Sequence, residues 1–205
     1  MRDSEGFDLW ADKYDEHVRE SEREGEYPFA GYGEVHERIF RRVTAKKNAA
    51  VLDLGFGTGT LTARLYNAGC RVFGQDFSKK MLETAAAKMP DAELYAGDLT
   101  QGLAEPLRKQ KYDFIIATYA LHHLTDSRKV SLLRELRALL REGGEILVGD
   151  VSFATAAERE ACRLAAGDEW DPDEYYIAAE ELRAELPELG FERVSFCAGI
   201  TTIRK

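Results

Sequence analysis

The feature that most constrains the fold is an apolar run that ends in alternating glycines. Residues 49–54 read Ala-Ala-Val-Leu-Asp-Leu, and they are followed by Gly55, Gly57 and Gly59. A short apolar run without alternation is typical of a strand that is buried on both faces. Glycines allow tight turns and remove side chains where a ligand lies close to the backbone. This order predicts a strand, a loop and a helix of a parallel sheet, with a ligand at the carboxyl ends of the strands.

Strand-like and helix-like segments alternate through the middle of the chain, which favours an open parallel sheet with helices on both faces. The predicted strands are Ala49–Leu54, Arg71–Gln75, Ala92–Ala96, Tyr112–Thr118 and Glu145–Val151. The predicted helices are Thr60–Ala68, Ser78–Lys88, Ser127–Leu140 and Ala178–Leu186.

The C-terminal segment departs from this alternation. Two strand-like runs, Phe191–Cys197 and Ile200–Arg204, are separated only by Ala198-Gly199. A connection that short cannot cross over a sheet, so the two runs are predicted to form an antiparallel hairpin. The fold class is therefore α/β: a Rossmann-like, doubly wound, mostly parallel seven-stranded sheet with an antiparallel C-terminal hairpin.

Two amphipathic stretches precede the first strand, from Phe7 to Arg19 and from Tyr32 to Val43. Their apolar residues recur at helical spacing, which predicts two cap helices that dock on the domain that follows. We therefore expect a helical cap over residues 1–48 and an α/β domain over residues 49–205, together forming one structural unit.

Composition narrows the functional classes. The net charge is −9 and the sequence pI is about 5.1, so the surface repels nucleic acid. Three scattered cysteines give no disulfide framework, and the four histidines form no ligand cluster in sequence, so no metal is expected. The polar N-terminus lacks a secretory signal, and no apolar stretch is long enough to span a membrane. We expect a cytoplasmic protein that binds neither nucleic acid nor membrane.

An acid follows the second predicted strand. Asp76 lies about 20 residues beyond the glycine loop, the separation expected of a residue that accepts hydrogen bonds from ribose hydroxyls. The alternative is that Asp76 is only a turn residue before a helix. The glycine loop alone is also compatible with a nicotinamide dinucleotide.

Five segments, taken in order, resemble the motifs of class I S-adenosylmethionine-dependent methyltransferases. They are Val51–Gly59, Gln75–Ser78 with Met81-Leu82, Ala96–Leu99, Tyr112–Ala117 with Leu121–Leu124, and Leu140–Leu147. The resemblance implies S-adenosylmethionine as cofactor, bound by the domain over residues 49–205. It implies these cofactor-binding residues: Gly55, Gly57, Gly59, Asp76, Phe77, Met81, Asp98, Leu99 and Ala117. One departure from the family pattern is Phe56, where a small residue is usual.

The segment Phe7–Asp15 resembles the N-terminal cap of small-molecule members of this family, including the uncharacterised YrrT-like methyltransferases. The resemblance implies that the Tyr14 hydroxyl reaches the carboxylate of the cofactor. The alternative is that Trp10 and Tyr14, four residues apart, form the buried stripe of a helix.

The acceptor side is less defined by sequence. His122 follows the fourth strand and is the candidate catalytic base, although a structural histidine is the competing interpretation. The acidic, aromatic segment 167–176 suits a cationic or amine acceptor, although a solvated loop would have the same composition. The candidate acceptor-binding residues are Tyr27, Tyr119, Trp170 and Tyr175.

Three functions remain open on these grounds. The first is a methyltransferase that acts on a small-molecule acceptor by in-line displacement. The second is an NAD-dependent oxidoreductase, against which stand the missing Tyr-x-x-x-Lys pair and the final hairpin. The third is a non-catalytic module that retains the cofactor site. A homodimer is compatible with each of them.

Overall fold

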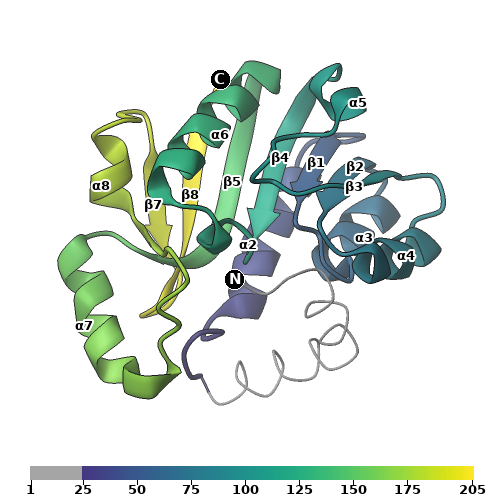
Figure 1. The fold of residues 1–205 in the computed structure, drawn as a ribbon. Coiled ribbons are helices and arrows are strands. Elements are labelled where there is room, and N and C mark those ends of the chain that lie inside the picture. The colour runs from purple at the N-terminus through teal and green to yellow at the C-terminus, as the bar shows by residue number, and fades with distance from the viewer. Residues whose placement is uncertain (1–24) are drawn as a thin grey trace.

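A mostly parallel sheet runs through the molecule with helices on both faces (Figure 1). The computed structural model describes residues 25–205. The first predicted cap helix and Tyr14 lie outside these residues. Within them, no helix is long and apolar enough to cross a membrane.

The strands form a single sheet in the order β3-β2-β1-β4-β5-β8-β7. All neighbours are parallel as far as β5, whereas β8 is antiparallel to both β5 and β7. The bounds are β1 Ala50–Leu54, β2 Arg71–Asp76, β3 Glu93–Ala96, β4 Tyr112–Thr118, β5 Leu140–Phe153, β7 Gly190–Arg193 and β8 Ala198–Arg204. A two-residue strand, β6 Ile177–Ala178, pairs with the end of β5. The predicted fold class is confirmed, with β6 as an addition.

The helices of the described residues are α2 Tyr32–Thr44, α3 Thr60–Asn67, α4 Lys79–Lys88, α5 Glu105–Arg108, α6 Asp126–Leu139, α7 Ala156–Ala166 and α8 Ala179–Arg183. Two 3-10 turns, Leu121–His123 and Gly167–Glu169, complete them. The hydroxyl of Ser78 accepts from the Met81 N–H and caps α4. Helix α7 was not among the predicted elements.

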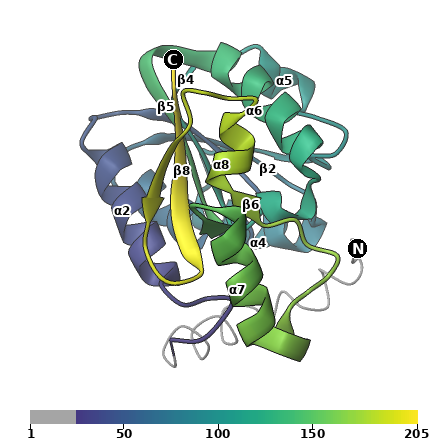
Figure 2. The same cartoon turned by 90° about the vertical axis from the view of Figure 1, so that its left-hand side faces the viewer.

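Side chains of alternate strand residues pack into two apolar cores, one on each face of the sheet. In β1, Val51 joins the core under α2, α3 and α4, whereas Leu52 joins the core under α6 and α8. Figure 2 shows α2 on one side of β5 and β8, and α6 and α8 on the other. The second cap helix therefore packs directly on the sheet.

The C-terminal hairpin turns earlier than expected, over residues 194–197 instead of 198–199. β7 ends at Arg193 and β8 begins at Ala198, so Ala198 and Gly199 belong to a strand. The Ser195 hydroxyl organises the turn, because it accepts from the N–H groups of Cys197 and Ala198 at 3.2 and 3.0 Å. The same hydroxyl donates to the carbonyl of Ala30 at 2.6 Å, which ties the turn to the segment before α2.

Strand β5 is also longer than predicted. It starts at Leu140, which pairs with Tyr112, and its register shifts before Glu145 pairs with Phe114. Residues 141–144, which lie between the predicted helix and the predicted strand, are thus an irregularity within the strand, with Gly143 at φ +71°.

Gly149 in β5 sets how closely α2 approaches the sheet. A Cβ on Gly149 would lie 2.3 Å from Val35 Cγ1 and 3.1 Å from Ile39 Cδ1, and both of these side chains are buried. We predict that Gly149→Ala lowers the free energy of unfolding by about 1–3 kcal/mol, because the helix must move outward. Urea denaturation of the single and double variants measures this effect. In Gly149→Ala/Val35→Ala the loss should be smaller than the sum of the two single losses, and simple additivity would contradict the steric explanation.

Candidate functional site

A cavity of about 650 Å³ opens at the carboxyl ends of the parallel strands. Segments that follow β1, β2, β3 and β4 line it, together with the approach to α2 and the segment around residues 169–176. This is the edge at which open α/β sheets bind ligands. The volume is sufficient for a nucleotide-sized molecule with a smaller one beside it.

The glycine loop forms one wall. Gly55, Gly57 and Gly59 adopt φ values of +70°, +56° and +79°, a region that side-chain-bearing residues rarely adopt. A Cβ on Gly55 would lie 2.4 Å from the Cβ of Ala120, so no side chain fits there. The loop leads into α3, whose N-cap is Gly59.

Asp76 joins this loop to the end of β2. Its carboxylate accepts from the N–H of Gly57 at 2.8 Å and from the N–H of Ser78 at 2.9 Å. Phe77, next to it, is 41% exposed, and Met81 lies buried one turn further on. All three side chains line the cavity.

Phe56, the departure from the family pattern, is accommodated by a second glycine. The residue is buried, and a Cβ on Gly74 of β2 would lie 2.6 Å from Phe56 Cδ1. The ring therefore packs on the face of β2, where Gly74 leaves the space. The sequence shows both residues, but only the fold reveals that they are in contact.

Asp53 lies beneath the loop and is fully buried. One carboxylate oxygen accepts from the Thr62 hydroxyl at 2.6 Å, and the other has no hydrogen-bond partner among residues 25–205. Burial raises the pKa of Asp53 to about 7; the Thr62 hydrogen bond opposes this shift and the nearby charge of Asp76 adds to it.

Asp98 and Leu99 follow β3 at the other side of the cavity. The carboxylate of Asp98 accepts from the N–H and the hydroxyl of Thr100, at 2.8 and 2.6 Å. The carbonyl of Leu99 accepts from Arg128 at 3.2 Å. These bonds fix the turn that presents both residues to the cavity.

Aromatic rings line the far end of the cavity. Phe29, Tyr32 and Tyr119 are mutual neighbours, with ring centroids 4.9 to 6.0 Å apart. Tyr119 has φ +50°, an uncommon conformation at the end of β4. His36 lies against Tyr32, and burial, with a smaller contribution from Arg64, lowers the pKa of His36 to about 4.

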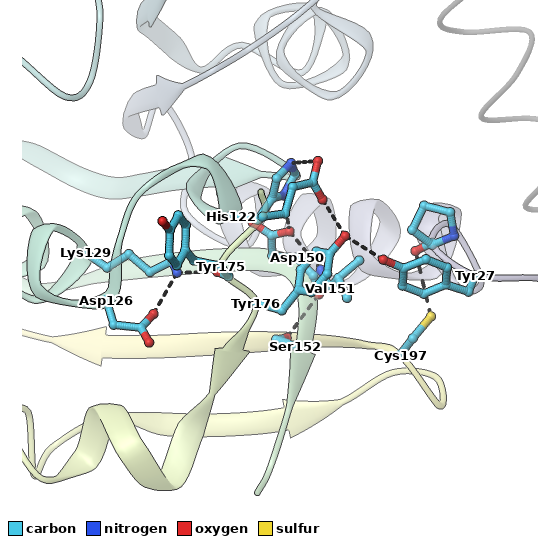
Figure 3. A network of polar contacts seen from close by, with 12 residues as sticks. Tyr27, His122, Asp126, Lys129, Asp150, Val151, Ser152, Tyr175, Tyr176 and Cys197 are labelled. Carbon is cyan, nitrogen blue, oxygen red and sulfur yellow. Dashed lines mark hydrogen bonds and ion pairs between the residues drawn. The ribbon is translucent and has the colours of Figure 1, made fainter. Parts of the chain in front are cut away.

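A chain of polar contacts lies beside these aromatic rings, at the same end of the cavity, as Figure 3 shows. His122 Nδ1 lies 2.7 Å from Asp150 Oδ1, and His122 Nε2 lies 3.6 Å from Glu174 Oε1. The Tyr176 hydroxyl donates to the other oxygen of Glu174 and lies 2.6 Å from the Tyr27 hydroxyl. Four separate parts of the chain meet in this network.

The pKa values of His122 and His123 are shifted in opposite directions. Burial opposes protonation of His122, but Asp150 and Glu174 outweigh it, so the pKa of His122 lies above its ordinary value. Burial, and then the charge of His122, lower the pKa of His123 to about 4. Potential metal-ligand atoms of His122, His123 and Glu174 lie within 4.8 Å of one another. His122 Nδ1 bonds Asp150 and one oxygen of Glu174 bonds Tyr176, which leaves His122 Nε2 and Glu174 Oε1 facing each other.

The segment around Tyr175 is held by its backbone. The Tyr175 N–H donates to the His122 carbonyl at 2.7 Å, and the buried Lys129 ammonium donates to the Tyr175 carbonyl. Arg159 donates to the Tyr176 carbonyl at 3.0 Å. In an extended segment alternate residues face opposite ways, so Glu174 and Tyr176 line the cavity while Tyr175 is 44% exposed.

Most of the predicted site residues come together at the cavity. Its lining includes Gly55, Gly57, Asp76, Phe77, Met81, Asp98, Leu99, Tyr27, Tyr119 and His122. Four others lie elsewhere, for different reasons. Ala117 faces the core on the α6 side, and Gly59 packs against Ala85 of α4. Trp170 stacks on the Tyr27 ring at 5.6 Å, and Tyr175 points outward.

Sequence reasoning missed several residues at the acceptor end: Phe29, Tyr32, His36, Asp150, Glu174 and Tyr176. Asp150 carries the same signal that identified Asp76, an acid near the carboxyl end of a parallel strand. Glu174 and Tyr176 lie inside the acidic, aromatic segment that the sequence indicates, on either side of the predicted Tyr175.

Comparisons with known proteins define the class. The methyltransferase domain family matches residues 51–144. In structure, the chain is similar to magnesium protoporphyrin IX methyltransferase from Synechocystis with bound SAH (20% identity, TM-score 0.67, 86% and 84% of the two chains). It is also similar to a DhpI-SAH complex (18% identity, TM-score 0.70, 97% and 93%). These two likenesses show the fold of class I methyltransferases.

Sequence relatives give the family. A protein of Geobacillus thermodenitrificans is 35% identical over 93% of this chain and 88% of its own length. A second, from Anoxybacillus flavithermus, is 36% identical over 76% and 70%. Both are described as uncharacterized methyltransferases. The chain belongs to this family, within the class I S-adenosylmethionine-dependent methyltransferases, and the oxidoreductase alternative is set aside.

The buried Asp53 predicts a pH-dependent stability. Its pKa of about 7 in the folded protein exceeds the ordinary carboxyl value, so the folded state retains a proton that the unfolded chain loses. The Asp53 contribution to the free energy of unfolding should therefore fall as pH rises from about 4 to 7, by up to about 1.4 kcal/mol per pH unit. Urea denaturation of the cofactor-free protein across this range, compared with Asp53→Asn, measures it. The variant should lose this part of the slope, and equal slopes would contradict the assignment.

Proposed function

We propose that the chain transfers the methyl group of S-adenosylmethionine to a small-molecule amine by in-line displacement. The observation that carries this proposal is one continuous cavity with two unlike ends. Glycine backbone, Asp76 at the end of β2 and Asp98 after β3 line one end. Aromatic rings and the carboxylates of residues 169–174 line the other.

The first end suits the cofactor. A carboxylate has up to four acceptor positions, so Asp76 can accept from ribose hydroxyls while it holds the loop. Asp98 would accept from the adenine amino group, with Phe77 and Leu99 beside the ring. Gly55 and Gly57 leave room for the methionine part. The fold neighbours described above with bound SAH support this arrangement.

The second end suits a cation. Glu169, Asp171, Asp173 and Glu174 line this part of the cavity. The faces of Tyr32 and Tyr119 attract a positive charge through their π electrons, and carboxylates neutralise it. An amine acceptor, cationic in solution and cationic again after methylation, matches both features.

The protein then has three tasks. The sulfonium supplies the activated methyl group, so the chain must hold the two molecules in line and exclude water. The buried aromatic end provides a water-poor surface for the acceptor nitrogen. The nitrogen must also present a lone pair, which requires that its proton be removed.

Cofactor binding is tested at Asp76. We predict that Asp76→Asn weakens S-adenosylmethionine binding roughly 10- to 100-fold, because hydrogen bonds to a charged group contribute about 1.5–3 kcal/mol. Isothermal titration calorimetry measures the effect. Asp91→Asn is the matched control, since Asp91 accepts from Tyr66 at the surface and lies outside the cavity lining. Equal affinities for both variants would refute the assigned ribose contact.

The reaction is tested with methyl-labelled S-adenosylmethionine and a panel of amines, thiols, alcohols and carboxylates. We predict labelled product with amines, and none from Asp76→Asn at cofactor concentrations that saturate only the unaltered protein. Product with non-amines alone would refute the amine acceptor. Tight cofactor binding without any product across the panel and a cell metabolite extract would instead indicate the non-catalytic module.

A further inference from the structure

Asp150 is a buried carboxylate near the carboxyl end of β5, 1% exposed, directly behind the acceptor end of the cavity. One of its oxygens accepts from the Val151 N–H at 2.8 Å and from His122 at 2.7 Å. Because this oxygen already accepts from the Val151 N–H, it is placed as an acceptor toward His122 as well, which assigns the hydrogen of a neutral imidazole to Nδ1. The position of Asp150 therefore determines which nitrogen of His122 faces the cavity.

The other nitrogen of His122 faces a second carboxylate. Nε2 lies 3.6 Å from Glu174 Oε1, at the edge of the cavity. When His122 is neutral, Nε2 carries a lone pair that faces the Glu174 carboxylate. A proton on Nε2 is therefore attracted both by this lone pair and by the carboxylate. This geometry belongs to a group that accepts a proton rather than to a passive core histidine.

Hydrogen bonds also hold the Glu174 carboxylate in place. The Tyr176 hydroxyl bonds to it, and the Tyr27 hydroxyl lies 2.6 Å beyond (Figure 3). Hydrogen bonds from the Tyr175 N–H to the His122 carbonyl and from Lys129 to the Tyr175 carbonyl fix the backbone between these side chains. The carboxylate thus has little freedom to leave His122.

We propose that His122 removes the proton from the acceptor ammonium, with Asp150 and Glu174 as its positioning residues. This proposal rests on the proposed amine methylation and assigns the base that the reaction needs. The ammonium gives a proton to Nε2 of neutral His122. The freed nitrogen lone pair forms a bond to the methyl carbon as the methyl–sulfur bond breaks, and that electron pair stays on sulfur. The methylated amine leaves as a cation, and His122 passes its proton to solvent.

The charges around His122 support this direction of transfer. Asp150 approaches from β5 and Glu174 from the segment before β6, the His123 ring centroid lies 4.2 Å from that of His122, and the charge of Lys129 of α6 also acts on His122. The two carboxylates stabilise an imidazolium formed between them. Lys129 opposes it, but this ammonium is itself paired with Asp126 at 2.8 Å.

The first experiment is the pH dependence of kcat with an amine found in the panel. For the unaltered protein kcat should rise with pH to a plateau, because only neutral His122 accepts a proton. His122→Gln should lower the plateau roughly 10²- to 10⁴-fold while S-adenosylmethionine affinity stays within about threefold. Asp150→Asn and Glu174→Gln should move the midpoint of the rise to lower pH, a change that a merely structural defect would not produce. Asp91→Asn should leave both plateau and midpoint unchanged.

The second experiment needs no acceptor. Nitrogen-15 NMR of histidine-labelled protein, with and without S-adenosylhomocysteine, should show His122 protonated on Nδ1 when neutral and titrating above a free histidine. In Asp150→Asn the pKa of His122 should be lower than in the unaltered protein. If no amine is methylated, the proposed function fails, and this measurement still decides whether Asp150 and Glu174 set the state of His122.

Three results would overturn the proposal. One is a His122→Gln variant that retains kcat within threefold. Another is neutral His122 with its hydrogen on Nε2. The third is loss of activity in EDTA that zinc or manganese restores, since this would make His122, His123 and Glu174 a metal site.

Discussion

The structure depends on one topological constraint: the parallel strand order reverses between β1 and β4. Loops from neighbouring strands there depart to opposite faces, so the sheet edge between them stays open. The glycine loop after β1 and the Tyr119 turn after β4 border this opening, and a Cβ on Gly55 would collide with Ala120 of the opposite segment. Nothing larger than glycine fits, which is why the backbone itself forms the wall.

Acidic side chains lie on both sides of this opening. Asp53 and Asp76 lie on the side proposed for the cofactor, and Asp150 and Glu174 lie on the side proposed for the acceptor. Methyl transfer would move a positive charge from sulfur toward nitrogen. Carboxylates near the nitrogen favour the charge more as the reaction proceeds, whereas those near the sulfur favour the ground state. The raised pKa of Asp53, about 7, limits how much negative charge remains on the cofactor side.

Sequence reasoning predicted what local patterns determine: the parallel strands, the antiparallel hairpin and the residues at strand ends, such as Asp76 and Asp98. Of the aromatic residues it placed at the acceptor end, Tyr27 and Tyr119 line the cavity, whereas Trp170 and Tyr175 do not. Which residues of segment 170–176 face inward depends on distant bonds. Lys129 of α6 holds the Tyr175 carbonyl, and no pattern within the segment contains that information. Likewise the hairpin turn is displaced because Ser195 bonds to Ala30, over a sequence separation of 165 residues. The packing of Phe56 on Gly74 is a third contact that only the fold brings together.

The polar chain from Tyr27 to Asp150 links two kinds of structure. Asp150 belongs to a central strand, whose position the sheet fixes, whereas Tyr27 and Glu174 belong to connecting segments outside the sheet. His122, in the short turn after β4, lies between them. Asp150, on the strand, sets which ring nitrogen of His122 faces the cavity. Glu174, in the connecting segment, sets whether a carboxylate faces that nitrogen. A segment that binds the acceptor therefore also completes the electrostatic surroundings of the base, so that in the proposed reaction acceptor binding and proton removal depend on the same hydrogen bonds.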